Sequence, residues 1–116
     1  MTVAQITETL DGTLLVGQEL LGLEIRSACG ADLMSDVMAF VKENVVLLTG
    51  LVNPQAIRTA DLMDIKVIVF VRGKTPPKDM LDEAAANGQA VIATKHTMFV
   101  SCGKLWEAGL RSGGTR

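Results

Sequence analysis

The sequence is poor in aromatic residues, which make up only 3% of its 116 residues. It contains three Phe, one Trp and no Tyr, although apolar residues as a whole reach 48%. The core must therefore be filled by Leu, Ile, Val, Ala and the six Met. A chain of this length is expected to form one domain that buries a sizeable core.

An excess of basic residues is also missing. The formal net charge is -2 at pH 7, the sequence pI is about 5.3, and like charges nowhere run to five in a row. Binding to DNA or RNA requires enough Lys and Arg to neutralise phosphate groups. We therefore expect no nucleic-acid partner.

Long apolar runs and a basic start are absent as well. The first 25 residues hold four acidic residues and no basic one, whereas a secretory signal begins with basic charge. The apolar run 67–71 is far shorter than the roughly 20 residues that span a membrane. We expect no membrane association and a cytoplasmic location, where cysteines stay reduced.

Histidine and cysteine are too few, and too far apart, for a metal site of the usual spacing. His96 is the only histidine, and Cys29 and Cys102 lack the paired C-x-x-C arrangement of structural zinc sites. We therefore expect no metal ion and no cofactor. An iron–sulfur or other metal protein remains an alternative, which would require Cys29 and Cys102 to meet across a dimer.

The beginning of the chain is expected to form a helix, two strands and a turn. Residues 2–5 have the spacing of a capping box, and a helical apolar pattern follows as far as Leu10. Residues 13–16 suit a short buried strand. The apolar alternation over 21–25 predicts a second, half-buried strand, and the small residues 27–30 predict a turn.

Residues 32–42 are expected to form an amphipathic helix. Met34 and Met38 widen its apolar stripe and are expected to fill gaps in the core. If these Met side chains are exposed instead, the helix offers an adaptable surface to a partner protein. The buried face is expected to contain Leu33, Val37, Phe40 and Val41.

Residues 45–110 repeat a strand–helix unit three times. The expected strands, 45–49, 66–71 and 90–94, are apolar on both faces, and an amphipathic helix follows each of them. Asn53-Pro54 has the residue types of a helix start, with Asn as the cap and Pro at the first position. The last helix, 97–110, is expected to bury Met98, Phe99, Cys102, Leu105 and Trp106.

Such a pattern predicts an α/β fold for residues 1–110. The fold has a mostly parallel sheet with covering helices, and its C-terminal half follows the order βαβαβα with right-handed crossovers. Residues 111–116 are expected to form a frayed tail.

Gly73-Lys74-Thr75 looks like the end of a phosphate-binding loop, but the rest of that loop is missing. The loop requires a glycine five positions before its last one, and Ile68 stands there, inside a predicted strand. Two prolines also follow Thr75. The sequence therefore argues against a nucleotide kinase. An enzyme that uses Lys95 or His96 as a base remains an alternative.

The ends of the three predicted parallel strands are the best candidate for a binding site. Ligands of such sheets bind beyond the carboxyl ends of the strands, where helix N-termini favour anions. The segments 49–53, 72–75 and 94–97 carry basic residues and no acidic one. We expect them to bind an anionic ligand, a nucleotide or a phosphorylated metabolite; ordinary surface charge is the alternative. The candidate residues are Thr49, Gly50, Asn53, Arg72, Gly73, Lys74, Thr94, Lys95, His96 and Thr97.

Over roughly residues 4–110 the chain resembles the DRTGG domain family. The similarity is strongest in 47–57, 68–73 and 93–99. Two departures stand out: Asn53-Pro54 occupies the place of the family's Asp-Arg, and Val71-Arg72-Gly73 occupies that of its Thr-Gly-Gly.

The chain looks like the short stand-alone members encoded near iron-only hydrogenase genes in anaerobes. The resemblance implies a fold like the N-terminal domain of HPr kinase, a homodimer and a regulatory role, with a redox enzyme as a partner. We therefore expect a non-enzymatic regulatory or ligand-binding domain. The alternative is a protein-interaction or iron–sulfur-associated accessory protein of a hydrogenase.

Overall fold

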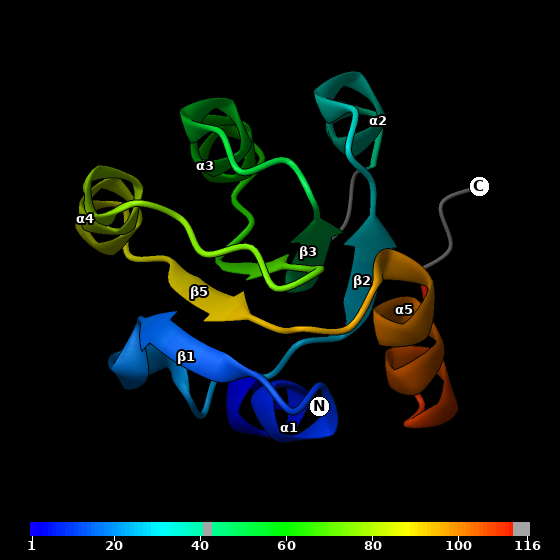
Figure 1. Ribbon diagram of the computed structural model, residues 1–116. Coiled ribbons are helices and arrows are strands. Elements are labelled where there is room, and N and C mark those ends of the chain that lie inside the picture. The colour runs from blue at the N-terminus through cyan, green and yellow to red at the C-terminus, as the bar shows by residue number, and fades with distance from the viewer. Residues whose placement is uncertain (41–42, 113–116) are drawn as a thin grey trace.

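The computed structural model describes residues 1–40 and 43–112, and within them the chain forms a five-stranded sheet (Figure 1). The strand order is β1-β5-β4-β3-β2. Strands β2 to β5 are parallel to one another, and β1 pairs with β5 in the antiparallel direction. The strands are β1 (Thr13–Val16), β2 (Ser27–Gly30), β3 (Val45–Thr49), β4 (Val67–Phe70) and β5 (Ala90–Ala93).

Helices cover both faces of the sheet. Figure 1 shows α2 (Met34–Met38), α3 (Pro54–Leu62) and α4 (Lys78–Ala86) on one face. Helices α1 (Val3–Thr9) and α5 (Met98–Glu107) lie on the other face, and a short 3₁₀ helix (Gln18–Leu20) follows β1. Each face has its own aliphatic core, as the composition requires. The predicted α/β fold, with its mostly parallel sheet and covering helices, is confirmed.

Several helices begin or end at the capping residues that the sequence predicts. The Thr2 hydroxyl accepts from the Gln5 backbone N–H at 3.2 Å, while the Gln5 side chain accepts from the Thr2 N–H at 2.8 Å. At the start of α3 the Asn53 side chain accepts from the Gln55 N–H at 2.8 Å. Gly88, with φ +73°, follows α4 in the conformation that glycine adopts readily.

The predicted strand over 21–25 is wrong, and the predicted turn over 27–30 is the edge strand β2. Leu21 and Leu23 instead accept hydrogen bonds at their carbonyls from the first turn of α1. Ala28 and Gly30 of β2 are small because they lie on the face of the sheet against which α5 packs closely. A Cβ added at Gly30 would lie 2.9 Å from the Cys102 sulfur.

The helix predicted over 32–42 is shorter, since α2 ends at Met38. Met34 and Val37 are buried, whereas Leu33 is 63% exposed and Met38 is 49% exposed. The expectation that Leu33 lies on the buried face is therefore wrong. Val41, the last residue assigned to that face, lies outside the described residues.

Three further expectations need correction. Phe99 and Trp106 lie on the solvent side of α5, 87% and 58% exposed, because the buried side of this helix is formed by Ser101 and Leu105. Strand β1 is a half-buried edge strand rather than a fully buried one. The ordered chain reaches past residue 110, since the Arg111 carbonyl accepts from the Ala28 N–H at 3.0 Å.

No helix within 1–40 and 43–112 has the length and apolarity that crossing a bilayer requires. The last tail residues, 113–116, lie outside the described part of the chain.

The end of β1 gives a stability test of this packing. Gly17 has φ +96°, and an added Cβ would lie 2.5 Å from the Ala90 Cα. Gly17→Ala should lower the free energy of unfolding by at least about 2 kcal/mol, since it adds both backbone strain and overpacking. In the matched control Gly22→Ala, an added Cβ meets no atom within 4 Å. Urea denaturation that gives both variants the wild-type midpoint would contradict the packing of β1 on β5.

Candidate functional site

The carboxyl ends of β3, β4 and β5 lie together and are hydrogen-bonded to one another. The Arg72 N–H donates to the His96 carbonyl at 2.8 Å, and the Gly73 N–H donates to the Thr94 carbonyl at 2.9 Å. The Lys74 ammonium donates to the Gly50 carbonyl at 2.8 Å. The structure thus brings the segments 49–53, 72–75 and 94–97 side by side, and we call them the strand-tip site.

A crevice lies within this site, where successive helices pack on opposite faces of the sheet. The chain leaves β4 for α4 on one face of the sheet and leaves the adjacent β5 for α5 on the opposite face (Figure 1). In open α/β sheets, ligands usually bind where two adjacent strands send their following connections to opposite faces of the sheet. A cavity of about 480 Å³ lies there, lined by Asp11, Thr13, Leu15, Gly73, Thr75, Ala93, Thr94 and Lys95.

The candidate residues divide between this cavity and its surroundings. Gly73, Thr94 and Lys95 line the cavity. The Thr94 hydroxyl donates to the Leu10 carbonyl at 2.7 Å, so this side chain ties β5 to the end of α1. The other predicted residues lie around the ends of β3 and β4 or at the start of a helix: Thr49, Gly50, Asn53, Arg72, Lys74, His96 and Thr97.

Arg72 is held by an unusual backbone turn. Its φ is +66° and that of Gly73 is +72°, so two successive residues adopt the left-handed conformation. For a residue other than glycine this conformation costs on the order of 1 kcal/mol or more, and such strain concentrates at functional sites. The turn places the guanidinium beside Gly50, since a Cβ added there would lie 3.5 Å from Arg72 Nη2.

Two carboxylates that the sequence analysis did not assign to the site also lie there. Asp32, just after β2, accepts from the Gly50 N–H at 2.7 Å and from the Thr49 hydroxyl at 3.3 Å. Asp11, just before β1, lies 3.1 Å from His96 Nε2. The three segments themselves are free of acidic residues, but neighbouring strands bring these two acids to them.

Some of the basic side chains of the site already interact with other groups of the protein. Lys74 is bound to Gly50 and His96 is paired with Asp11. In contrast, neither the Arg72 guanidinium nor the Lys95 ammonium has a hydrogen bond or ion pair with any described residue. These two cations are therefore the ones that remain available to an anionic ligand.

The helix N-termini at the strand-tip site have fewer free N–H groups than the sequence predicts. The Asn53 side chain accepts from the Gln55 N–H in α3, and the Thr97 hydroxyl accepts from the Val100 N–H in α5 at 3.2 Å. At α4 the residue before the helix is Pro77, which has no N–H to offer. The cationic groups of the site that have no partner among the described residues are thus the side chains of Arg72 and Lys95.

The two cysteines do not form a joint site. Cys29 packs on the face of the sheet that carries α2, and Cys102 packs on the face that carries α5. Burial raises the pKa of both thiols above the ordinary value of 9.0. Protonated thiols are poor metal ligands and poor nucleophiles. In the described part of the chain, His, Cys, Asp and Glu nowhere gather in threes suited to a metal ion.

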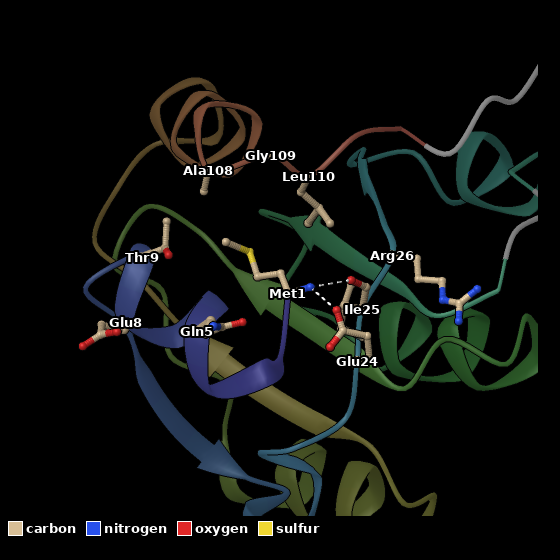
Figure 2. Close-up of a pocket in the computed structure, with 10 residues that line it drawn as sticks. All are labelled: Met1, Gln5, Glu8, Thr9, Glu24, Ile25, Arg26, Ala108, Gly109 and Leu110. Atoms are coloured by element: carbon tan, nitrogen blue, oxygen red, sulfur yellow. Dashed lines mark hydrogen bonds and ion pairs between the residues drawn. The ribbon is translucent and has the colours of Figure 1, made fainter.

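A second cavity, of about 580 Å³, lies near the ends of α1 and α5, and Figure 2 shows its lining. The Met1 amino group pairs there with the Glu24 carboxylate and donates to the Ile25 carbonyl at 3.2 Å. Helix C-termini carry the negative end of the helix dipole. The Met1 amino group is paired with Glu24, so Glu8 and Arg26 remain as charges of the lining, and the helix C-termini make this cavity less suited to an anion than the strand-tip site. Its lining residues are Met1, Gln5, Glu8, Thr9, Glu24, Ile25, Arg26, Ala108, Gly109 and Leu110.

Comparison with known proteins identifies a relative of this fold. No family model and no curated protein matches the sequence. The chain is similar to a solved structure of the CBS and DRTGG domains of the regulatory region of Clostridium perfringens pyrophosphatase, complexed with the activator diadenosine tetraphosphate. The TM-score is 0.74 at 18% sequence identity, and the similarity covers 90% of this chain and 45% of that chain. This supports a DRTGG-like α/β fold.

The ion pair at the edge of the site predicts a measurable pKa. The hydrogen bond with His96, helped by the positive charge of Lys104, holds the pKa of Asp11 below its ordinary value of 3.8. The stabilisation that comes from the lowered pKa of Asp11 is present above the unfolded-state pKa of this carboxyl and is lost as the pH falls through its folded-state pKa.

His96→Ala should return the pKa of Asp11 toward 3.8, as followed by NMR titration of the carboxyl carbon. Lys104→Ala should raise this pKa by less, because its influence is smaller. An unchanged Asp11 titration in His96→Ala would show that the pair does not form in solution.

Proposed function

We propose that this chain is a non-enzymatic regulatory domain that binds a phosphorylated small molecule, such as a nucleotide, in the strand-tip site. The observation that carries the proposal is the cavity at the ends of β4 and β5, which β1 also lines, with Lys95 and the Gly73 of the left-handed turn in its lining. A fold shared with a regulatory region that was solved with a nucleotide activator supports the same assignment.

The lining of the cavity suits a ligand that has both a charged and a polar part. Lys95 offers a cation to a phosphate group, and phosphate contacts to charged donors are among the stronger hydrogen bonds of proteins. Thr13 and Thr75 are exposed there and offer hydroxyl groups. Asp11 offers acceptor oxygens to a sugar hydroxyl, and Leu15 offers a small apolar wall.

Two polar groups at the strand-tip site already have partners within the protein, which favours ligand binding over catalysis. The Thr94 hydroxyl is committed to the Leu10 carbonyl, and His96 is held by Asp11 at the exposed edge. The described lining contains no serine or cysteine that His96 would activate as a nucleophile. We infer that the domain senses its ligand and leaves it unchanged.

The sequence resemblance extends the proposal to the biological setting. It suggests a homodimer in the cytoplasm of an anaerobe, with a role near an iron-only hydrogenase or another redox enzyme. A protein-interaction role is the second candidate, and its support is the exposure of Leu33 and Met38 around the short helix α2.

Isothermal titration tests the ligand proposal directly. The panel is inorganic phosphate, AMP, ATP and diadenosine tetraphosphate, and at least one of the nucleotides should release or absorb heat with saturation. Lys95→Gln and Arg72→Gln should each weaken binding by about tenfold, as expected for the loss of one charge-assisted hydrogen bond.

Lys66→Gln is the matched control. Lys66 lies at the opposite end of β4, where it pairs with Asp64 at 3.3 Å, so this change removes the same charge away from the cavity. The proposal fails if the whole panel is silent. It also fails if Lys66→Gln weakens binding as much as Lys95→Gln does.

A further inference from the structure

A carboxylate lines the cavity that we assign to a phosphorylated ligand. Asp11 lies in the same lining as Lys95, but among the described residues its ion-pair partner is His96 and not Lys95. A carboxylate repels a phosphate group, and like charges at close range disfavour binding. Asp11 therefore weakens the binding of a bare phosphate. It favours a ligand only where it accepts a hydrogen bond from that ligand.

The backbone at Asp11 is fixed to the sheet on both sides of this residue. The Leu10 carbonyl accepts from the Thr94 hydroxyl at 2.7 Å. Gly12 packs so closely on β5 that an added Cβ would lie 2.9 Å from Ile92 Cγ2. Asp11 itself follows α1 in the left-handed conformation, with φ +51°. Because the backbone holds the carboxylate at the cavity before a ligand arrives, little further ordering is needed on binding.

The carboxylate of Asp11 has one oxygen in use and one to offer. Its Oδ2 lies 3.1 Å from His96 Nε2, whereas its Oδ1 has no hydrogen bond with any described residue. The hydrogen bond with His96, helped by the charge of Lys104, holds the pKa of Asp11 below 3.8, so the group is ionised at neutral pH. An ionised carboxylate only accepts hydrogen bonds. Its counterpart on the ligand must therefore be a donor.

A neutral donor suits this carboxylate better than a further cation does. His96 and Lys104 already supply positive charge to Asp11. The Asp11 side chain is 73% exposed, and ion pairs between exposed groups contribute little. A hydroxyl group, in contrast, forms a charge-assisted hydrogen bond with a carboxylate, which is stronger than a bond between neutral groups. The vicinal hydroxyls of ribose are such donors, and in dinucleotide-binding α/β sheets an acidic side chain binds them.

The cavity has room for a sugar and a phosphate together. Its volume of about 480 Å³ lies within the roughly 300–1,000 Å³ that is usual for small-molecule sites. Asp11 reaches it from the connection between α1 and β1, and Lys95 reaches it from the end of β5. Opposite charges offered by two different elements fit a ligand that is anionic at one end and carries hydroxyl groups at the other.

We propose that Asp11 makes the strand-tip site selective for ribonucleotides, by accepting hydrogen bonds from the ribose hydroxyls while Lys95 binds the phosphate. This inference rests on the proposed function, which requires only that the ligand is phosphorylated. It adds that the same carboxylate attracts the sugar and repels a phosphate compound without one, so its removal changes the two affinities in opposite directions.

Isothermal titration with three related probes tests this selectivity. The probes are ATP, 2′,3′-dideoxyATP, which lacks both ribose hydroxyls, and inorganic triphosphate, which lacks the nucleoside. The wild-type protein should bind ATP about tenfold more tightly than dideoxyATP. Asp11→Gly should weaken ATP binding about tenfold and remove the difference between the two nucleotides. It should strengthen the binding of triphosphate by roughly two- to fivefold, the range for interactions between exposed charges.

Asp64→Gly is the matched control. Asp64 follows α3 in the same left-handed conformation, with φ +59°, and lies before β4, at the end of this strand opposite the cavity. Its side chain is 86% exposed. Glycine adopts this conformation readily, so both variants should keep the fold, as circular dichroism verifies. Asp64→Gly should leave all three affinities unchanged.

The outcomes separate this inference from the function on which it rests. If none of the three probes binds the wild-type protein, the proposed function fails and the ribose assignment fails with it. If the probes bind but ATP is no tighter than dideoxyATP, only the ribose assignment is overturned. The same holds if Asp11→Gly lowers the affinities for ATP and triphosphate equally, or if Asp64→Gly has the effect of Asp11→Gly.

Discussion

Adjacent parallel strands β4 and β5 send their helices to opposite faces of the sheet, and the other features of this molecule follow from that divergence. Helices α2, α3 and α4 pack on one face, and only after β5 does the chain cross to the side of α1 (Figure 1). The two connections separate and leave a cavity between them. The same crossing lays α5 against β3 and against Gly30 of β2, with Phe99 and Trp106 on its exposed side.

Backbone hydrogen bonds fix the two diverging connections to each other. The N–H groups of Arg72 and Gly73 donate to the carbonyls of His96 and Thr94, so the left-handed turn at 72–73 is fixed against the end of β5. The Thr94 hydroxyl in turn fixes the end of β5 to α1. Because the backbone is anchored in this way, a rigid frame holds Lys95 in the cavity lining and the Arg72 guanidinium beside Gly50, which lowers the ordering cost of binding.

Internal pairing limits what this site can bind. Asp32 and Asp11 approach the site from neighbouring elements and balance part of its positive charge, and Lys74 serves as a structural link to Gly50. An unbalanced cluster of basic residues would attract any polyanion. Two available cations at the strand tips, of which Lys95 lies beside hydroxyl groups and a carboxylate, favour a small phosphorylated molecule with neutral polar parts.

Residues 45–94 were predictable because their strands are buried on both faces and read as continuous apolar runs. Strand β2 was not, since its residues Ser, Ala, Cys and Gly look like a turn; close packing of α5 requires small residues at Ala28 and Gly30. With β2 unrecognised, Asp32 was not seen to follow a strand end. Asp11 was missed because its place depends on the antiparallel pairing of β1 with β5.

Helix α5 shows a second limit of sequence reasoning. It has two apolar stripes, one through Leu105 and one through Phe99 and Trp106, and periodicity alone does not decide which one packs on the sheet. Small side chains in β2 favour the stripe with the smaller residues, so the large aromatics face outward.

Amide chemical shifts recorded by NMR during titration with ATP test most directly whether the crevice between the β4 and β5 connections binds a phosphorylated ligand, because they report both binding and its location. We predict saturable shifts concentrated at residues 72–75 and 93–96. Shifts that cluster instead around Met1, Glu24 and Gly109, or no shifts at all, would contradict binding in this crevice.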